Sequence, residues 1–201
     1  MRICVNFGLV TVLVACGGVG PDSKYSLRAG DEFYRQGRYE EARAAYAASI
    51  YRFSFSMMAV ARGRYGLARS QGQLCEFDEA IKNFTEASLY FQMAFDGKPN
   101  EYLAQSYFEV ARLYYDYGDY SSAITPFQKA VEIADEFHAS AKDPIGYADV
   151  LEDYRDSLEK SQNTSRALEI QEKIHGLRID HPGARASFQI VRFNAKCKRV
   201  R

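Results

Sequence analysis

The sequence predicts an all-α fold, an α-solenoid of about four antiparallel helix pairs. Three observations lead to it. One spacing of small and aromatic residues recurs along the chain, proline- and glycine-containing stretches separate the copies, and apolar residues make up 47% of the 201 residues. That apolar share is enough for a buried core. A long recurring spacing is typical of helix pairs that bury their apolar faces against neighbouring pairs.

The recurring spacing places a small residue, an aromatic residue, an alanine, a second aromatic residue and another small residue at fixed intervals. Its three clear copies are Gly37, Tyr39, Ala42, Tyr46 and Ser49; Cys75, Phe77, Ala80, Phe84 and Ala87; and Gly118, Tyr120, Ala123, Phe127 and Ala130. A further small residue precedes each of these alanines by twelve positions: Gly30, Ala68 and Ala111. A fourth, degenerate copy surrounds Ala167, with Gln162, Thr164, Gln171 and Ile174 in the matching places.

These residues resemble the tetratricopeptide repeat, a pair of antiparallel helices joined by a tight turn. The resemblance implies that small residues let paired helices approach closely, while aromatic rings fill the space between pairs. The residues expected to pack in this way are Gly30, Ala42, Tyr46, Ala68, Ala80, Phe84, Ala111, Ala123 and Phe127. The marker alanines lie 38, 43 and 44 residues apart, which resembles the longer repeat of kinesin light chains.

Each helix can be placed from these markers and from local start and stop signals. Gly37 and Gly118 suit left-handed turns within pairs, and Cys75 at the equivalent turn is expected to be a tolerated small residue. Asp143 before Pro144 is a typical helix start. The stretches 96–100, 142–144 and 181–183 contain proline and separate or end the pairs. Helices are therefore expected at 25–36, 39–54, 57–73, 77–95, 100–117, 120–138, 144–161 and 164–180.

The first sixteen residues predict a lipoprotein signal. Met1-Arg2 precedes an uncharged stretch that is too short for a permanent membrane span. Leu13-Val14-Ala15-Cys16 resembles the bacterial lipobox, which implies a signal peptide at 1–15, lipidation at Cys16 and a glycine-rich tether at 16–24. Gly17 after the cysteine implies sorting to the outer membrane, facing the periplasm. The alternative is a buried first strand or helix that happens to contain a cysteine.

The formal net charge of zero conceals two oppositely charged parts. All 26 acidic residues lie between Asp22 and Asp180, whereas residues 185–201 contain six basic residues and no acidic one. The repeat array at 25–182 is therefore acidic, and the tail at 183–201 is basic. No nucleic-acid partner is expected. The tail's apolar residues are expected to cap the last helix pair, and contact of its charges with anionic lipid or cell-wall polymer is the alternative.

The cysteines leave one structural question open. If Cys4 is lost with the signal and Cys16 is lipidated, Cys75 and Cys197 remain. A periplasmic location would permit a disulfide between them, but the sequence does not show whether they meet.

The resemblance also implies a concave groove lined by the first helix of each pair, where proteins of this kind bind peptides or partner helices. Arginines beside aromatic residues in the middle of this groove suit a carboxylate or an acidic, partly apolar peptide, and an acidic wall follows in the fourth repeat. The alternative is ordinary solvated helix faces. The groove candidates are Tyr34, Arg62, Tyr65, Arg69, Phe108, Arg112, Tyr115, Asp149, Glu152 and Asp156.

No catalytic constellation is recognisable. The three histidines lack metal-ligand spacing, and no phosphate-binding glycine loop or nucleophile motif occurs. The carboxylates of residues 149–159, Asp153 among them, are expected to form a solvated face. Neither enzyme activity nor a cofactor or metal is therefore expected.

The function expected from these features is a membrane-anchored scaffold or adaptor of the bacterial cell envelope, which binds an envelope protein or peptide in its groove. Two alternatives stay open: a cytoplasmic peptide-sensing repeat regulator, and a cell-wall enzyme with an unrecognised site.

Overall fold

The computed structural model describes residues 26–187, 190–193 and 197. The predicted signal at 1–15, Cys16 and the tether lie outside these residues, as do the basic residues Lys196, Lys198, Arg199 and Arg201 of the tail. The described part is helical and contains no strand. Its helices are α1 Leu27–Arg35, α2 Tyr39–Arg52, α3 Met57–Gln73, α4 Phe77–Ala94, α5 Glu101–Asp116, α6 Tyr120–Glu136, α7 Ala139–Lys142, α8 Pro144–Lys160 and α9 Thr164–Asp180.

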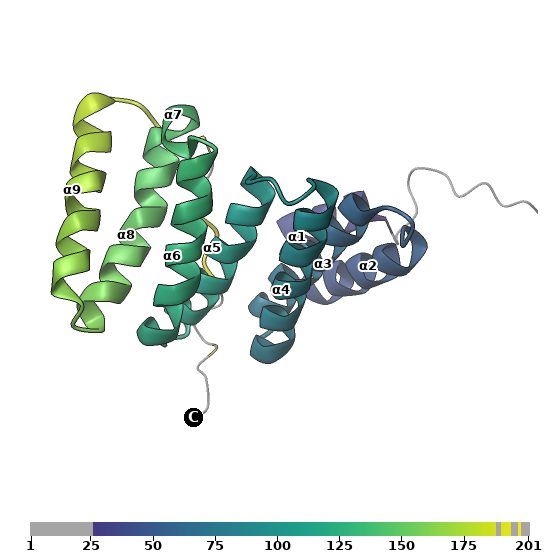
Figure 1. The fold of residues 1–201 in the computed structure, drawn as a ribbon. Coiled ribbons are helices and arrows are strands. Elements are labelled where there is room, and N and C mark those ends of the chain that lie inside the picture. The colour runs from purple at the N-terminus through teal and green to yellow at the C-terminus, as the bar shows by residue number, and fades with distance from the viewer. Residues whose placement is uncertain (1–25, 188–189, 194–196, 198–201) are drawn as a thin grey trace, which may run out of the picture.

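The eight long helices form four antiparallel pairs that stack side by side: α1/α2, α3/α4, α5/α6 and α8/α9 (Figure 1). The predicted α-solenoid of four pairs is confirmed. The short helix α7 was not predicted. The sixth helix ends at Glu136, two residues before its expected end, because His138 adopts a left-handed backbone (φ 59°) that a continuing helix does not permit.

The same turn joins the two helices of every pair. Its central residue is left-handed in each repeat: Gly37, Cys75, Gly118 and Gln162 have φ between 61° and 81°. In each turn the residue directly after the left-handed one donates its backbone N–H to the carbonyl five positions back, as Arg38 does to Phe33 and Asn163 to Leu158. This closure satisfies carbonyls at the end of the first helix. Degeneration of the fourth repeat in sequence therefore leaves its turn geometry unchanged.

The first helix of each pair starts with a side-chain cap. Ser26, Ser56, Asn100 and Asp143 each accept a hydrogen bond from a backbone N–H three residues further on, which satisfies one of the free amides of the first turn. The Asp143 carboxylate accepts from Gly146 at 2.8 Å, so the predicted helix start at this residue is confirmed. Four uniform starts fix the register of the helices that line the concave face.

Close contact between small residues and rings holds the pairs together. Ala42, Ala68, Ala80, Ala111, Ala123, Phe84 and Phe127 are fully buried, and Tyr46 is 4% exposed. Gly30 is also buried, so every residue of the predicted packing set lies in the interior. A Cβ at Gly30 would lie 2.6 Å from the Tyr46 ring, and one at Gly66 would lie 2.3 Å from it. Tyr46 thus fits between α1 and α3 only because both positions lack a side chain.

We expect Gly66→Ala to destabilise the chain by about 1–3 kcal/mol, because the added methyl group must displace the buried Tyr46 ring. Gly176→Ala in α9 is the matched control. No atom lies within 4 Å of a Cβ at Gly176, so this change should stabilise the chain by about 0.5–1 kcal/mol through helix propensity. Urea unfolding followed by circular dichroism measures both, and equal effects of the two variants would contradict this packing.

Candidate functional site: the inner-helix groove

The predicted groove residues lie on α1, α3, α5 and α8, the first helix of each pair, and four of them, Tyr34, Tyr65, Arg69 and Arg112, belong to one polar network with Glu109. The Arg69 guanidinium stacks 4.2 Å from the centre of the Tyr34 ring. The Tyr65 hydroxyl donates to Glu109 Oε1 at 3.0 Å, and Arg112 Nη1 donates to Glu109 Oε2 at 3.2 Å. Glu109 therefore joins α3 to α5 at the floor of the groove.

The surroundings of Tyr65 and Arg69 fix the protonation of these two side chains. Burial, reinforced by the Glu109 charge, raises the pKa of Tyr65 well above its usual value. Burial alone would lower the pKa of Arg69, but Glu109 and the surrounding tyrosines outweigh it and raise that pKa. Tyr65 is therefore a permanent hydrogen-bond donor, and Arg69 is a permanent cation, across the range of ordinary pH.

Two pockets open from this floor. The smaller, about 150 Å³, is lined on one side by Arg62, Tyr65 and Arg69 and on the other by Tyr102 and Gln105 of α5. Arg62 is half-exposed, and its closest acidic neighbour is Asp31 at 3.9 Å. Tyr46 donates its hydroxyl to the same aspartate at 2.6 Å. This pocket offers cationic and aromatic groups to a ligand.

The larger pocket, about 360 Å³, lies between α5 and α8 and is bounded by α7 and Ser187. Phe108 and Arg112 line it together with Phe137 and Tyr147. Arg112 is only 5% exposed, and its Nε has no hydrogen-bond partner among the described residues. Arg112 is therefore held within the floor by Glu109 and is not a freely presented surface charge.

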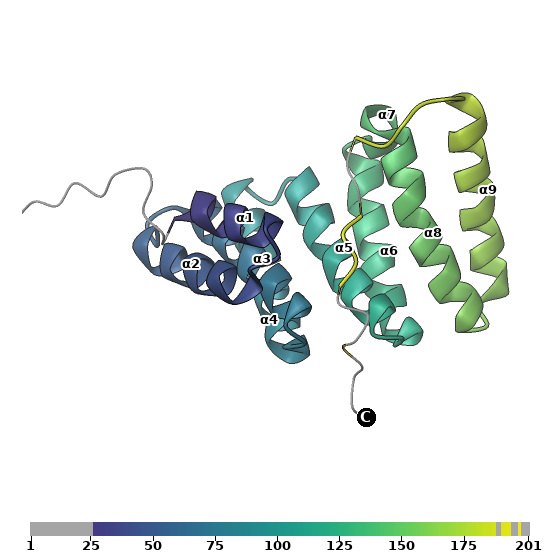
Figure 2. The same cartoon turned by 180° about the vertical axis from the view of Figure 1, so that it is seen from behind.

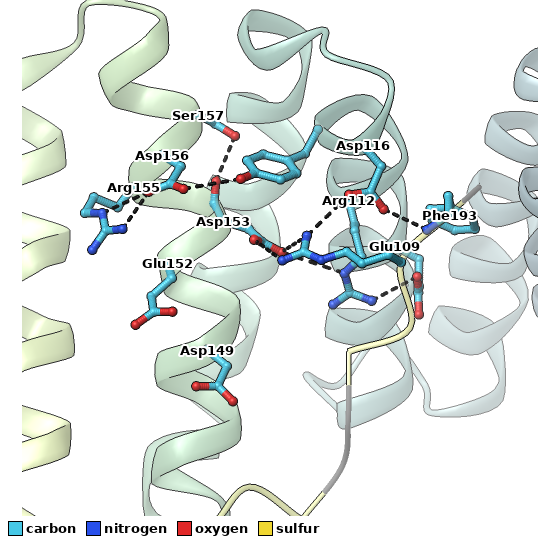
Figure 3. Close-up of polar contacts among 12 residues, drawn as sticks. Glu109, Arg112, Asp116, Asp149, Glu152, Asp153, Arg155, Asp156, Ser157 and Phe193 are labelled. Carbon is cyan, nitrogen blue, oxygen red and sulfur yellow. Dashed lines mark hydrogen bonds and ion pairs between the residues drawn. The ribbon is translucent and has the colours of Figure 1, made fainter. Parts of the chain in front are cut away.

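A second cluster joins the C-terminal segment to the array (Figure 3). Arg192 donates to Asp153 through two hydrogen bonds of 2.7 and 2.8 Å, and to Asp116 at 3.3 Å. Asp116 also accepts the backbone N–H of Phe193 at 2.8 Å. Burial raises the pKa of both aspartates, although Arg192 opposes the shift. The cluster thus consists of two buried carboxylates on α5 and α8 and a cation supplied by the tail.

The tail does not cap the last helix pair, and that expectation was wrong. Figure 2 shows the C-terminal segment leaving the end of α9, passing α7 and running along α5. Ser187 donates to Asp143, Phe193 packs near Phe84 and Leu113, and Cys197 forms a disulfide with Cys75. The segment crosses the groove because Arg192 binds carboxylates on the inner helices α5 and α8, and Phe193 packs against residues of α4 and α5.

The disulfide also corrects the interpretation of Cys75. The thiol was expected to be a tolerated small residue at the turn, but it bonds to Cys197 across 122 residues of sequence. No sequence signal distinguishes this pairing, because the two cysteines meet only when the tail lies in the groove.

The acidic wall predicted in the fourth repeat is divided by the structure. Asp149 and Glu152 both pair with Arg178 of α9, and Figure 3 shows them apart from the Asp153 cluster. Asp156 accepts from the Tyr115 hydroxyl at 3.2 Å, so it does reach the third repeat. The carboxylate that turns fully inward is Asp153, 3% exposed.

Asp153 was wrongly assigned to a solvated face, and a signal for it existed. It occupies the repeat position held by Glu109 in the preceding repeat, fourteen residues before the marker alanine. Glu109 is buried as well, at 5% exposure. Aligning charged residues by repeat position would have paired the two carboxylates. Arg192 and Phe193 belong to no repeat, so the sequence offers no comparable signal for them.

Two further properties of the described residues concern the site. None of the helices there combines the length and the apolar character needed to cross a membrane. No group of three or more histidine, cysteine, aspartate or glutamate side chains in that part of the chain could hold a metal ion.

The geometry defines a class: an α-solenoid of tetratricopeptide-like helix pairs with a lined concave groove. Comparison with known proteins agrees. The family model of the tetratricopeptide repeat matches residues 57–136, which contain α3 to α6. The fold is similar to BtubC (BKLC) from P. vanneervenii, with a TM-score of 0.67 and 22% identity over 81% of this chain and 67% of that chain. No curated protein matches significantly. Tetratricopeptide repeats are protein-protein interaction scaffolds.

We expect Arg192→Gln to cost about 2 kcal/mol of stability at pH 7, because it removes the cation that hydrogen-bonds to two buried carboxylates. Loss of the cation raises the pKa of both aspartates further in the folded state, so the folded variant keeps protons that the unfolded chain has lost. The loss of stability should therefore grow as pH rises from about 4 to 7.

Urea unfolding at both pH values measures this effect. Arg185→Gln is the matched control, because Arg185 is an exposed cation of the same tail, and its effect should be small and independent of pH. A cost for Arg192→Gln that is larger at pH 4 than at pH 7 would contradict the assignment.

Proposed function

We propose that this protein is a lipid-anchored scaffold of the bacterial cell envelope that binds an extended segment of a partner protein in its inner-helix groove. The observation that carries the proposal is the pocket of about 150 Å³ in which Arg62, Tyr65 and Arg69 face Tyr102 and Gln105. Arginine beside aromatic rings favours a carboxylate or an acidic, partly apolar segment.

The groove is preorganised for such a ligand. Its floor is tied across two repeats through Glu109, so Tyr65 and Arg69 lose little freedom on binding. Arg62 lies at the rim, where a half-exposed guanidinium can exchange its long contact with Asp31 for a partner carboxylate. The ligand therefore gains a charge-assisted contact at a small cost in conformational entropy.

Two observations support an envelope location. The sequence of residues 13–16 resembles a lipobox, whose thioether-linked chains would give stable anchoring. The disulfide between Cys75 and Cys197 suits an oxidising compartment such as the periplasm and is rare in the cytosol. The lipid anchor would hold the groove near the membrane and expose it to envelope proteins.

We expect Arg62→Glu combined with Phe108→Ala to weaken partner binding by about tenfold or more, since both side chains line the groove; Arg62 is half-exposed and Phe108 is partly buried at the edge of the core. Arg112 is unsuitable for charge reversal because it is buried between Glu109 and Asp153. Crosslinking in intact cells identifies the partner, and titration with the purified partner measures the loss.

Lys129→Glu on the outer helix α6 is the matched control, because its side chain is 55% exposed and lies away from the groove. A partner that binds the groove variant and the control with equal affinity would refute the groove as the binding surface.

The anchor is tested separately. Labelled palmitate should enter the wild-type chain in a bacterial host and be lost in Cys16→Ala, because the thioether requires that thiol. Cys4→Ala, which alters the predicted signal peptide only, should keep the label. An intact Met1 on purified wild-type protein would contradict processing at Cys16.

A further inference from the structure

The C-terminal segment is held in the groove as a bound peptide would be. The Arg192 carbonyl accepts from Gln73 Nε2 at 2.8 Å, and the Phe193 N–H donates to Asp116 Oδ2 at 2.8 Å. Side chains of α3 and α5 thus bind both polar atoms of the peptide group that joins Arg192 to Phe193. Backbone contacts of this kind recognise an extended segment whatever chain supplies it.

The guanidinium site is built into the array itself. Asp116 closes α5 and Asp153 lies in the middle of α8, and their side chains are 8% and 4% exposed. Burial raises the pKa of both, so their charged forms are costly without a cation. Arg192 engages both carboxylates in a forked arrangement that a lysine could not reproduce. Arginine is the cation that the site selects.

An aromatic slot lies beside the guanidinium site. Phe193 is 3% exposed and contacts Leu113, with the Phe84 ring 6.3 Å away edge-on. A Cβ at Gly72 would lie 2.4 Å from the Phe193 ring. The missing side chain of Gly72 therefore creates the room for the ring, and the slot accepts a planar aromatic group next to the arginine.

The bound segment is retained by non-covalent contacts, which can exchange, and by one covalent bond. The Arg192 side chain remains 48% exposed, so its ion pairs lie at the surface and can exchange. The segment is held covalently by the disulfide between Cys197 and Cys75, and Cys75 lies three residues after Gly72. While it is closed, the tail competes with any free peptide at a high effective concentration.

We propose that this site, formed by Gly72, Leu113, Asp116 and Asp153, is a receptor for a partner segment in which arginine precedes an aromatic residue. The chain's own Arg192 and Phe193 occupy it until the disulfide opens. A dithiol reductant opens it by exchange: one thiolate attacks a sulfur of the bond, and the second then closes the reductant's own disulfide. Two electrons and two protons pass to the chain, which leaves Cys75 and Cys197 as thiols.

This inference rests on the proposed groove function and gives the groove two chemically distinct ends. The pocket with Arg62 and Arg69 accepts acidic groups, and the pair Asp116 and Asp153 accepts a basic one. A partner that spans both would carry its acidic and its Arg-aromatic elements in a fixed order, which sets the direction in which it binds.

The test uses the full-length chain with the self-ligand removed by Arg192→Ala, Phe193→Ala and Cys197→Ser. The probe is a fluorescent peptide with the sequence of residues 190–196, Ile-Val-Arg-Phe-Asn-Ala-Lys. Fluorescence anisotropy should show saturable binding below about 1 mM peptide. Replacing the peptide's arginine by glutamine, or adding Gly72→Ala to the chain, should weaken binding by about tenfold or more.

Circular dichroism checks independently that the triple variant folds. A second measurement does not need that variant. The wild-type chain should bind the peptide at least about tenfold more tightly after treatment with dithiothreitol than before it. Arg62→Glu should leave peptide binding unchanged, which separates failure of this inference from failure of the acidic-ligand pocket.

Equal affinity for the arginine and glutamine peptides would overturn the proposal, as would absence of binding to both the folded triple variant and the reduced wild-type chain. A dimer joined by Cys75 of one copy and Cys197 of another would identify a second copy as the occupant and would also overturn it.

Discussion

The structure depends on how closely the two helices of each pair and the neighbouring pairs can approach. Tyr46 lies against Gly30 and Gly66 at distances that leave no room for a Cβ. In the next two repeats the place of Gly30 is held by Ala68 and Ala111, which are fully buried. Because interiors are packed to crystal-like density, these contacts fix the angle between pairs. The angle in turn brings Tyr65 of α3 to Glu109 of α5, and Arg112 of α5 to Asp153 of α8.

The distribution of charge in the groove follows from this close approach of the helices. Side chains on three different helices meet in a floor of low exposure, where an unpaired charge is costly and a paired one is held firmly. Glu109 is balanced by Arg112, and Asp153 by Arg192 of the tail. The result is a groove with a basic, aromatic end and an acidic end. The near-zero net charge of the chain therefore reflects an acidic array that is partly neutralised by its own tail.

Most of the fold was predictable because the same pattern of packing residues occurs several times in the sequence of a repeat protein. Three copies of one spacing located the helix pairs, and glycine at two turns indicated the left-handed geometry. The short α7 escaped prediction, since His138 shows no turn signal of its own. The groove residues were also placed on the correct helices, but a spacing rule applied only to small and aromatic residues did not show which charge turns inward. Asp149 and Asp153 are one helical turn apart, yet only Asp153 faces α5.

The sequence by itself determined the class of the fold, the number of helix pairs and the basic and aromatic character of the groove, because each is a local pattern repeated at fixed spacing. Only the tertiary structure decided where the tail lies and that Cys75 pairs with Cys197. Those contacts join residues from 39 to 122 positions apart. They form because two helices contribute buried carboxylates that bind a cation, and a glycine leaves room for a ring. No single segment of the sequence contains all the residues of this site.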